Sequence, residues 1–136
     1  MAKKLETKTI KQTVTFPSTP DKVYDLFLDG KKLTAIHGAK ATMSKKPDGK
    51  FTIFDGYCFG YNIELVEDKK IEQAWVFREE GWPEDHYSIC TFLLQPAKSG
   101  TKLVFTQKGV PEHKYQSINE GWKSYYWFPM LQYFLK

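Results

Sequence analysis

A chain of 136 residues with 41% hydrophobic and 16% aromatic residues can bury its own core, and we expect residues 1–136 to form a single domain. The net charge of +4 does not indicate nucleic-acid binding, because Arg78 is the one arginine among twenty basic residues and arginine makes the bidentate contacts that recognise phosphates and bases. The sequence has neither an apolar run of membrane-spanning length nor a signal-peptide core, so we expect a cytoplasmic protein without membrane contact.

The N-terminal part predicts one strand followed by two short helices. Apolar and polar residues alternate over residues 7–16, which is the pattern of a half-buried strand. Ser18-Thr19-Pro20 is typical of a helix start, and Asp29-Gly30 predicts the end of that helix. Residues 31–37 predict a second short helix before the remaining strands.

From Lys40 onward the hydrophobic period changes to two, the period of strands. The joints carry turn residues, such as Pro47-Asp48-Gly49 and Asp55-Gly56, and are short enough to make neighbouring strands antiparallel. Six strands are predicted, over residues 40–44, 50–55, 57–66, 70–78, 86–95 and 102–109.

One face of these strands is richer in large apolar side chains, and we assign it to the concave side of the sheet. Asn62, Glu64 and Glu72 alternate with this set and are expected to face solvent, while Leu93 and Val104 fall on the opposite face and make the alternation imperfect there. The assigned concave residues are Phe51, Ile53, Phe59, Tyr61, Ile63, Leu65, Ile71, Trp75, Phe77, Cys90, Phe92, Leu94, Leu103 and Phe105.

Residues 111–136 predict a long helix, because apolar residues recur there at steps of three and four. The stretch from Tyr125 to Leu131 is apolar on all sides, so more than one of its faces needs cover, and Pro129 should bend the helix. A sheet with one unpaired apolar face must fold around this helix. The expected class is α+β: a seven-stranded curved antiparallel sheet wrapped around a long C-terminal helix, with two short helices after the first strand.

This order of elements resembles the helix-grip fold of the START-related, birch-pollen-allergen-like (SRPBCC) superfamily. Within it, the chain is similar to the C-terminal domain of the activator of heat-shock protein 90 ATPase. The resemblance extends from about Ile10 to the end of the chain. The residues on which the resemblance rests are Phe54-Asp55-Gly56 with Gly60, Ile71 with Trp75, Trp82-Pro83-Glu84 with His86, Gly100-Thr101, Gly109-Val110-Pro111, and Gly121-Trp122 with Tyr125-Tyr126.

The sequence contains no recognisable catalytic constellation, so we expect no catalytic residues, metal or cofactor. Cys58 and Cys90 lie far apart, which favours reduced, packed thiols. The histidines lie at predicted helix ends and loops, where structural roles are more common, and His86 is expected to order its loop by hydrogen bonding. Gln73, Gln107 and some tyrosines are the polar groups left to face inward, too few to predict an enzyme.

Two interpretations of the terminal helix remain open. Gly121 either allows close packing of helix on sheet or leaves room for a ligand, and the neighbouring aromatic residues either fill a core or line a cavity. The apolar residues near Trp127, Phe128 and Leu131 indicate a protein-contact surface, so the chain is a monomer or a homodimer. The residues predicted to line a ligand cavity are Phe51, Ile53, Tyr61, Trp75, Phe77, Phe92, Trp122, Tyr126 and Met130.

The leading hypothesis is a non-enzymatic binding module for an apolar or aromatic small molecule. The resemblance implies the same, because its superfamily mostly binds apolar small molecules. The alternative that it implies is a chaperone-associated interaction protein, and a cyclase- or hydrolase-like enzyme comes third.

Overall fold

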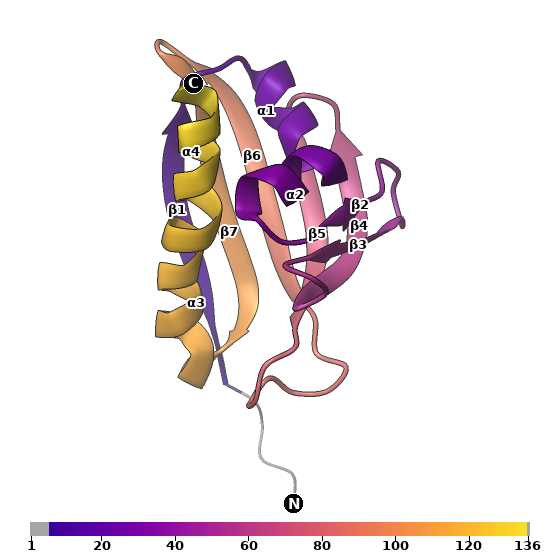
Figure 1. The fold of residues 1–136 in the computed structure, drawn as a ribbon. Helices are drawn as coiled ribbons and strands as arrows, with labels where there is room; N and C mark the ends of the chain where they lie inside the picture. Colours follow the sequence, from indigo (N-terminus) through magenta and orange to yellow (C-terminus); the bar gives the residue numbers. More distant parts are fainter. Residues whose placement is uncertain (1–5, 136) are drawn as a thin grey trace, which may run out of the picture.

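The computed structural model describes residues 6–135, which form one curved sheet and a set of helices (Figure 1). The sheet has seven strands, all antiparallel to their neighbours, in the order β1-β7-β6-β5-β4-β3-β2. The strands are β1 (Thr7–Phe16), β2 (Thr42–Met43), β3 (Lys50–Ile53), β4 (Cys58–Val66), β5 (Lys70–Phe77), β6 (Ser88–Ala97) and β7 (Gly100–Pro111). The predicted class, a seven-stranded curved antiparallel sheet with the helix-grip order of elements along the chain, is therefore confirmed, although β2 is shorter than residues 40–44.

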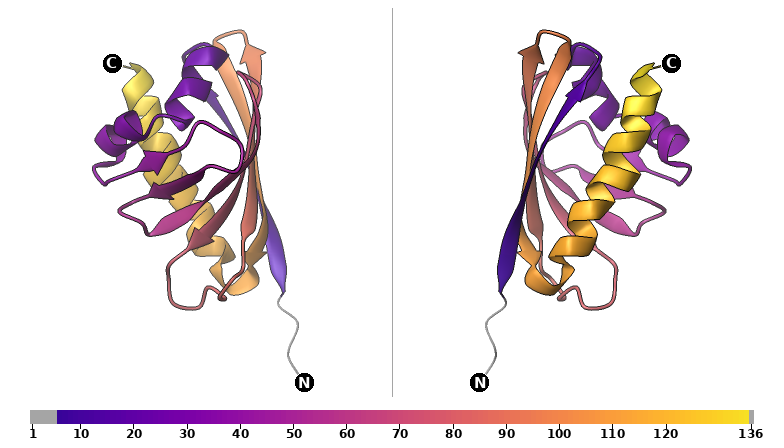
Figure 2. Two further views of the ribbon diagram at one scale, coloured as in Figure 1. Left: turned by 90° about the vertical axis from the view of Figure 1, so that its right-hand side faces the viewer. Right: turned by 90° about the vertical axis from the view of Figure 1, so that its left-hand side faces the viewer.

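The helices lie on one side of the sheet, as Figure 2 shows with the sheet nearly edge-on. After β1 come α1 (Pro20–Phe27) and α2 (Gly30–His37), and after β7 a short 3₁₀ turn (Glu112–Lys114) leads into the terminal helix. The terminal helix consists of α3 (Tyr115–Gly121), the π-helical segment η2 (Trp122–Trp127) and α4 (Phe128–Leu135).

Asp29 begins α2 instead of ending α1 as predicted. Its side chain accepts a hydrogen bond of 3.0 Å from the backbone N–H of Lys32, which is the geometry of an N-cap. Leu28 closes α1, and Gly38 closes α2 in the left-handed region at φ 70°. The Ser18-Thr19-Pro20 start is confirmed, with Thr19 at the cap position and Pro20 as the first helical residue, although the Thr19 side chain makes no capping hydrogen bond.

The face assignment of β4 was wrong. Gly60 pairs with Phe51 and Trp75, both core residues, so alternation turns Phe59 and Tyr61 to the outer face, where Tyr61 is 36% exposed. Asn62, predicted to face solvent, is fully buried instead. A bulge between residues 62 and 64 then reverses the alternation, which is how Leu65 comes to pair with Ile71 and pack against the core.

The π-helical segment changes which aromatic residues face the sheet. In a segment with i→i+5 hydrogen bonds, residues four and five positions apart share a face. Trp122, Tyr126 and Trp127 are therefore all buried, and the rings of Trp122 and Trp127 stack with centroids 5.3 Å apart. The sequence predicted Trp127 on a protein-contact surface together with Phe128; only Phe128, at 59%, is strongly exposed.

Candidate functional site

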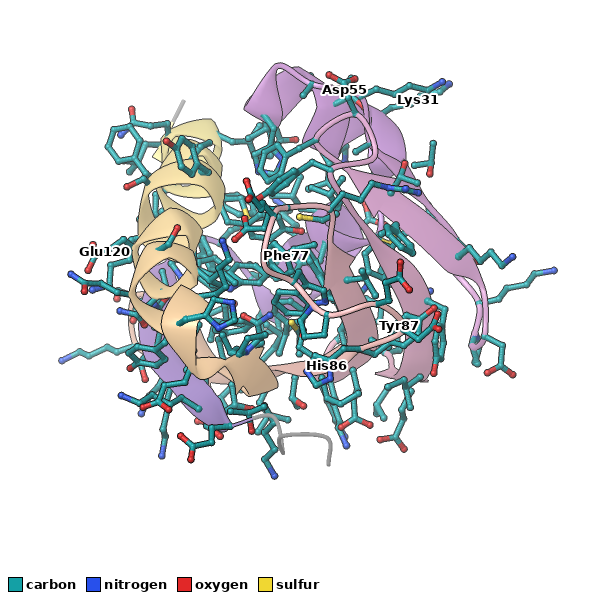
Figure 3. All side chains as sticks on the ribbon, turned by 90° about the horizontal axis from the view of Figure 1, so that it is seen from below. Lys31, Asp55, Phe77, His86, Tyr87 and Glu120 are labelled. Atoms are coloured by element: carbon teal, nitrogen blue, oxygen red, sulfur yellow. The ribbon has the colours of Figure 1, made fainter. Side chains whose placement is uncertain are left out.

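A pocket of about 320 Å³ opens between the first half of the terminal helix and the facing strands. It lies at the end of the molecule seen in Figure 3, where Phe77 lies between helix and sheet and Glu120 points away on the outer side of the helix. Its aromatic lining is Phe54, Tyr57, Trp75, Phe77, Trp122, Tyr125 and Tyr126. The other lining residues are Cys58, Glu79, Ser117, Ile118 and Gly121.

Gly121 faces this pocket and leaves it open on the helix side. A Cβ at this position would meet one atom within 4 Å, the Cδ2 of Tyr125 at 3.8 Å, which is an ordinary van der Waals contact. The backbone of Gly121 is helical, at φ −60° and ψ −39°, so its conformation does not require glycine. Close packing against the sheet therefore does not explain this glycine, and the absent side chain contributes directly to the space in the pocket.

The wall opposite the helix is held by an unusual backbone conformation at Phe54. This residue has φ 55°, in the left-handed region that bulky side chains rarely adopt, and Asp55 follows it at φ 57°. Asp55 stabilises the turn, because its Oδ1 accepts a hydrogen bond of 3.0 Å from the N–H of Lys40 and its own N–H donates to the Lys40 carbonyl at 2.9 Å. Such strained residues cluster at ligand sites, and here the turn places the Phe54 ring in the pocket wall.

The mouth of the pocket carries one carboxylate that joins three parts of the chain. Glu79, just after β5, accepts a hydrogen bond from the hydroxyl of Tyr57 and lies 3.1 Å from the ammonium group of Lys114. Its side chain is only 19% exposed, so this ion pair is better shielded from water than a surface pair.

His37, the last residue of α2, lies behind the pocket wall. Its ring stands 5.0 Å from the ring of Phe54 and 4.9 Å from that of Tyr126, centroid to centroid. Both ring nitrogens are buried and have no hydrogen-bond partner among the described residues. Burial lowers the pKa of His37 to about 4, so its imidazole is neutral at physiological pH.

The polar side chains buried under the helix already form hydrogen bonds with other buried side chains. Trp75 donates its indole N–H to Gln73 at 2.8 Å, and Gln73 donates in turn to Asn62 at 2.9 Å. Trp122 donates to Gln107 at 2.7 Å, and Gln107 donates to Ser88 at 2.9 Å. Gln73 and Gln107 do face inward as predicted, but both serve as partners of tryptophans.

Cys58 is the remaining reactive group in the wall. Both cysteines are free and buried, as predicted, and burial raises the pKa of the Cys58 thiol. Its neutral thiol therefore acts as a small apolar surface. Tyr126 behaves similarly, because burial raises the pKa of its phenol and the hydroxyl stays protonated.

The structure brings four of the nine predicted cavity residues to the pocket: Trp75, Phe77, Trp122 and Tyr126. Tyr61 lies on the outer face of the sheet, 36% exposed, because the strand face was misassigned. The other four are buried in the packed core away from the pocket lining, namely Phe51, Ile53, Phe92 and Met130.

Sequence reasoning missed the rim of the pocket. Phe54, Tyr57 and Glu79 lie in the turns that flank β4 and β5, where hydrophobic alternation carries no information about direction. One signal was available: Phe54-Asp55-Gly56 is a turn string in which an aromatic residue precedes Asp-Gly.

His86 orders its loop as predicted. Its Nε2 lies 2.6 Å from the Gly109 carbonyl, and its own carbonyl accepts the indole N–H of Trp82 at 2.8 Å. His113 makes a similar contact from the other side, with its Nε2 2.9 Å from the Gly81 carbonyl. These contacts fasten the loop between β5 and β6 beside the pocket mouth.

Residues 6–135 contain no group of three or more histidine, cysteine, aspartate or glutamate side chains placed to hold a metal ion. None of the helices in that range has the length and apolar character needed to cross a membrane.

Comparison with known proteins places the chain in a family. Residues 17–134 match the family described as Activator of Hsp90 ATPase homolog 1-like protein. An uncharacterised Schizosaccharomyces pombe protein is 32% identical over 126 residues, which are 93% of this chain and 37% of that protein. The human activator of 90 kDa heat shock protein ATPase homolog 1 is 30% identical over 131 residues, 96% of this chain and 38% of that protein. The chain thus spans little more than a third of the length of these relatives.

Solved structures agree with this placement. An HSP90 activator from Plasmodium falciparum superposes with a TM-score of 0.78 at 27% identity, covering 87% of this chain and 89% of that one. A Mesorhizobium loti protein superposes equally well, with a TM-score of 0.78 over 94% of this chain and 96% of that one, but at 19% identity it shows likeness of fold alone. The chain therefore belongs to the family of Activator of Hsp90 ATPase homolog 1-like proteins, as its resemblance to the activator's C-terminal domain predicted.

Proposed function

We propose that this chain is a non-enzymatic binding module for an apolar or aromatic small molecule, held between the terminal helix and the sheet. The observation that carries the proposal is the pocket of about 320 Å³ beside Gly121, which has the size of a small-ligand site and a mostly aromatic lining. The inward-facing amides of Gln73 and Gln107 already accept hydrogen bonds from tryptophans, and an amide does not titrate near neutral pH, so neither serves as a general acid or base.

The test uses tert-butylbenzene, a neutral aromatic hydrocarbon, and the indole N–H signals of the four tryptophans in an ¹⁵N NMR spectrum. We expect saturable shifts at Trp75 and Trp122, whose rings line the pocket, and smaller ones at Trp82, which lies outside the lining. The matched control is Gly121→Leu, whose side chain fills the pocket without strain on the helix. Absence of saturable shifts in the unaltered protein, or equal shifts in Gly121→Leu, would refute the proposal.

A second candidate function is association with an Hsp90-type chaperone. It is favoured by family membership, since one relative is a human activator of the 90 kDa heat shock protein ATPase, and by the exposed aromatic side of the terminal helix. Tyr125 is 67% exposed and Phe128 59%, and such exposed aromatic residues are typical of protein interfaces.

The test for this candidate is direct binding of purified Hsp90, followed by its ATPase rate. We expect binding that Phe128→Ala weakens and that Leu93→Ala, an equally conservative change at an exposed residue of β6, leaves intact. A chain that neither binds Hsp90 nor changes its ATPase rate, while still binding tert-butylbenzene, would leave the small-molecule function standing alone.

A further inference from the structure

One wall of the pocket is built from a cluster of aromatic rings. The ring centroids of Trp75 and Trp122 lie 5.0 Å apart at 55°, and those of Trp122 and Tyr126 lie 4.9 Å apart at 75°. The third pair, Trp75 and Tyr126, is 6.0 Å apart at 78°. All three residues line the pocket and their rings pack against one another at steep angles, so this part of the pocket wall is a cluster of contacting aromatic side chains.

The charge among the described lining residues is negative. Among the described residues that line the pocket, Glu79 is the one with a charged side chain at neutral pH, and no lysine, arginine or histidine is included. Lys114 holds the Glu79 carboxylate at 3.1 Å but does not itself line the pocket. The electron-rich faces of aromatic rings and a carboxylate attract cations, and residues of both kinds line this pocket.

We propose that the pocket selects molecules that carry an ammonium group, in particular a methylated or otherwise alkylated amine on an apolar or aromatic body. The ammonium lies against the rings of Trp75, Trp122 and Tyr126 on the side of Glu79. This inference rests on the proposed binding function and narrows it to a ligand class. Anionic ligands are disfavoured, because the described lining offers them no basic side chain and faces them with the Glu79 carboxylate.

The experiment compares two probes of nearly the same shape, phenyltrimethylammonium and tert-butylbenzene, which differ in a quaternary nitrogen in place of a quaternary carbon. Both are titrated against the ¹⁵N-labelled chain, with the indole signals of Trp75 and Trp122 as readout. We expect the cation to bind about tenfold more tightly than the hydrocarbon, the range of a desolvated cation–π site.

Two variants at the mouth separate the carboxylate from the rings. Glu79→Gln keeps the size of the side chain and removes its charge, so it should reduce the preference for the cation over tert-butylbenzene severalfold. Lys114→Gln removes the competing ammonium that holds Glu79, so it should increase cation affinity. Thermal unfolding of both variants shows whether each is folded before the titrations are compared.

The outcomes distinguish this inference from the function on which it rests. If tert-butylbenzene binds as tightly as phenyltrimethylammonium, the ammonium selectivity is wrong and the apolar binding module stands. If the cation is preferred but Glu79→Gln and Lys114→Gln do not alter the preference, the assigned role of Glu79 is wrong. If neither probe binds, both the function and the inference are overturned.

Discussion

The indole nitrogen of Trp122 donates a hydrogen bond of 2.7 Å to Oε1 of Gln107, joining the terminal helix to β7 inside the core. Gln107 is fully buried, and its Nε2 donates in turn to the hydroxyl of Ser88. The helix is therefore fixed to the sheet by a directional contact in addition to aromatic packing.

Replacing Gln107 by leucine should lower the free energy of unfolding by about 2 kcal/mol, because the buried indole N–H of Trp122 loses its acceptor. Urea unfolding measures this change. Gln95→Leu is the matched control, since Gln95 is exposed on β6 and its replacement should stay within about 0.5 kcal/mol. Adding Trp122→Phe to Gln107→Leu should cost less than the sum of the two single changes, and full additivity would contradict the role assigned to the hydrogen bond.

Gly121→Ala should raise the free energy of unfolding by about 1 kcal/mol, because alanine favours a helix and the new Cβ meets no atom closer than 3.8 Å. Gly60→Ala provides the contrast. A Cβ on Gly60 would lie 1.7 Å from the Ala74 carbonyl oxygen, so the strand would have to shift and the protein should be strongly destabilised. Equal effects of the two substitutions in thermal or urea unfolding would show that Gly121 is also a packing glycine.

His37 should make the protein acid-sensitive. Burial lowers its folded pKa to about 4 from the ordinary value of 6.5, so as the pH falls through this window the unfolded chain takes up a proton that the folded chain does not. The resulting loss of stability is about 1–2 kcal/mol after allowing for solvent screening of a partly exposed ring.

His37→Phe removes this proton uptake and also removes two buried nitrogens that have no hydrogen-bond partner within residues 6–135. We expect the variant to be more stable than the unaltered chain at pH 7, and its advantage to grow as the pH falls from 6.5 to 4. Subtracting the two stability curves cancels the carboxylates that titrate in the same range. A difference that does not depend on pH would mean that the His37 ring leaves its buried position without cost.

Most of the fold was predictable because the spacing of hydrophobic residues and the residues that form turns are local features of the sequence. The strands and their antiparallel joints followed from alternation and from Asp-Gly turns, and the resemblance gave the helix-grip arrangement. The prediction of which face of β4 points to the core failed. Its larger residues, Phe59 and Tyr61, lie on the outer side, while the core side carries Cys58, Gly60 and Asn62. Size was the wrong guide there: Gly60 is needed where the strand backbones approach closely.

The candidate site was predictable only where it lies on regular elements. Trp75, Trp122 and Tyr126 followed from periodicity and from the helix facing the sheet. Phe54 and Glu79 did not, because their directions depend on turn geometry that forms only when distant segments meet. Whether the space under the helix is a filled core or a cavity also depends on what surrounds Gly121 in three dimensions. The sequence pattern alone does not contain this information.

Trp127 and Phe128 are neighbours in sequence that the π-helical segment turns to opposite environments. Trp127 is 3% exposed and donates its indole N–H to Gln12 of β1 at 2.6 Å, whereas Phe128 is 59% exposed. Trp127→Ala should therefore cost about 3–5 kcal/mol of unfolding free energy, as for other large buried aromatic residues, and Phe128→Ala should stay within about 0.5 kcal/mol. Urea unfolding of the two variants compares them directly. A regular α-helix would turn Trp127 away from the face shared by Trp122 and Tyr126. Similar costs for the two variants would therefore argue against the i→i+5 segment, and also against Phe128 as an exposed contact residue.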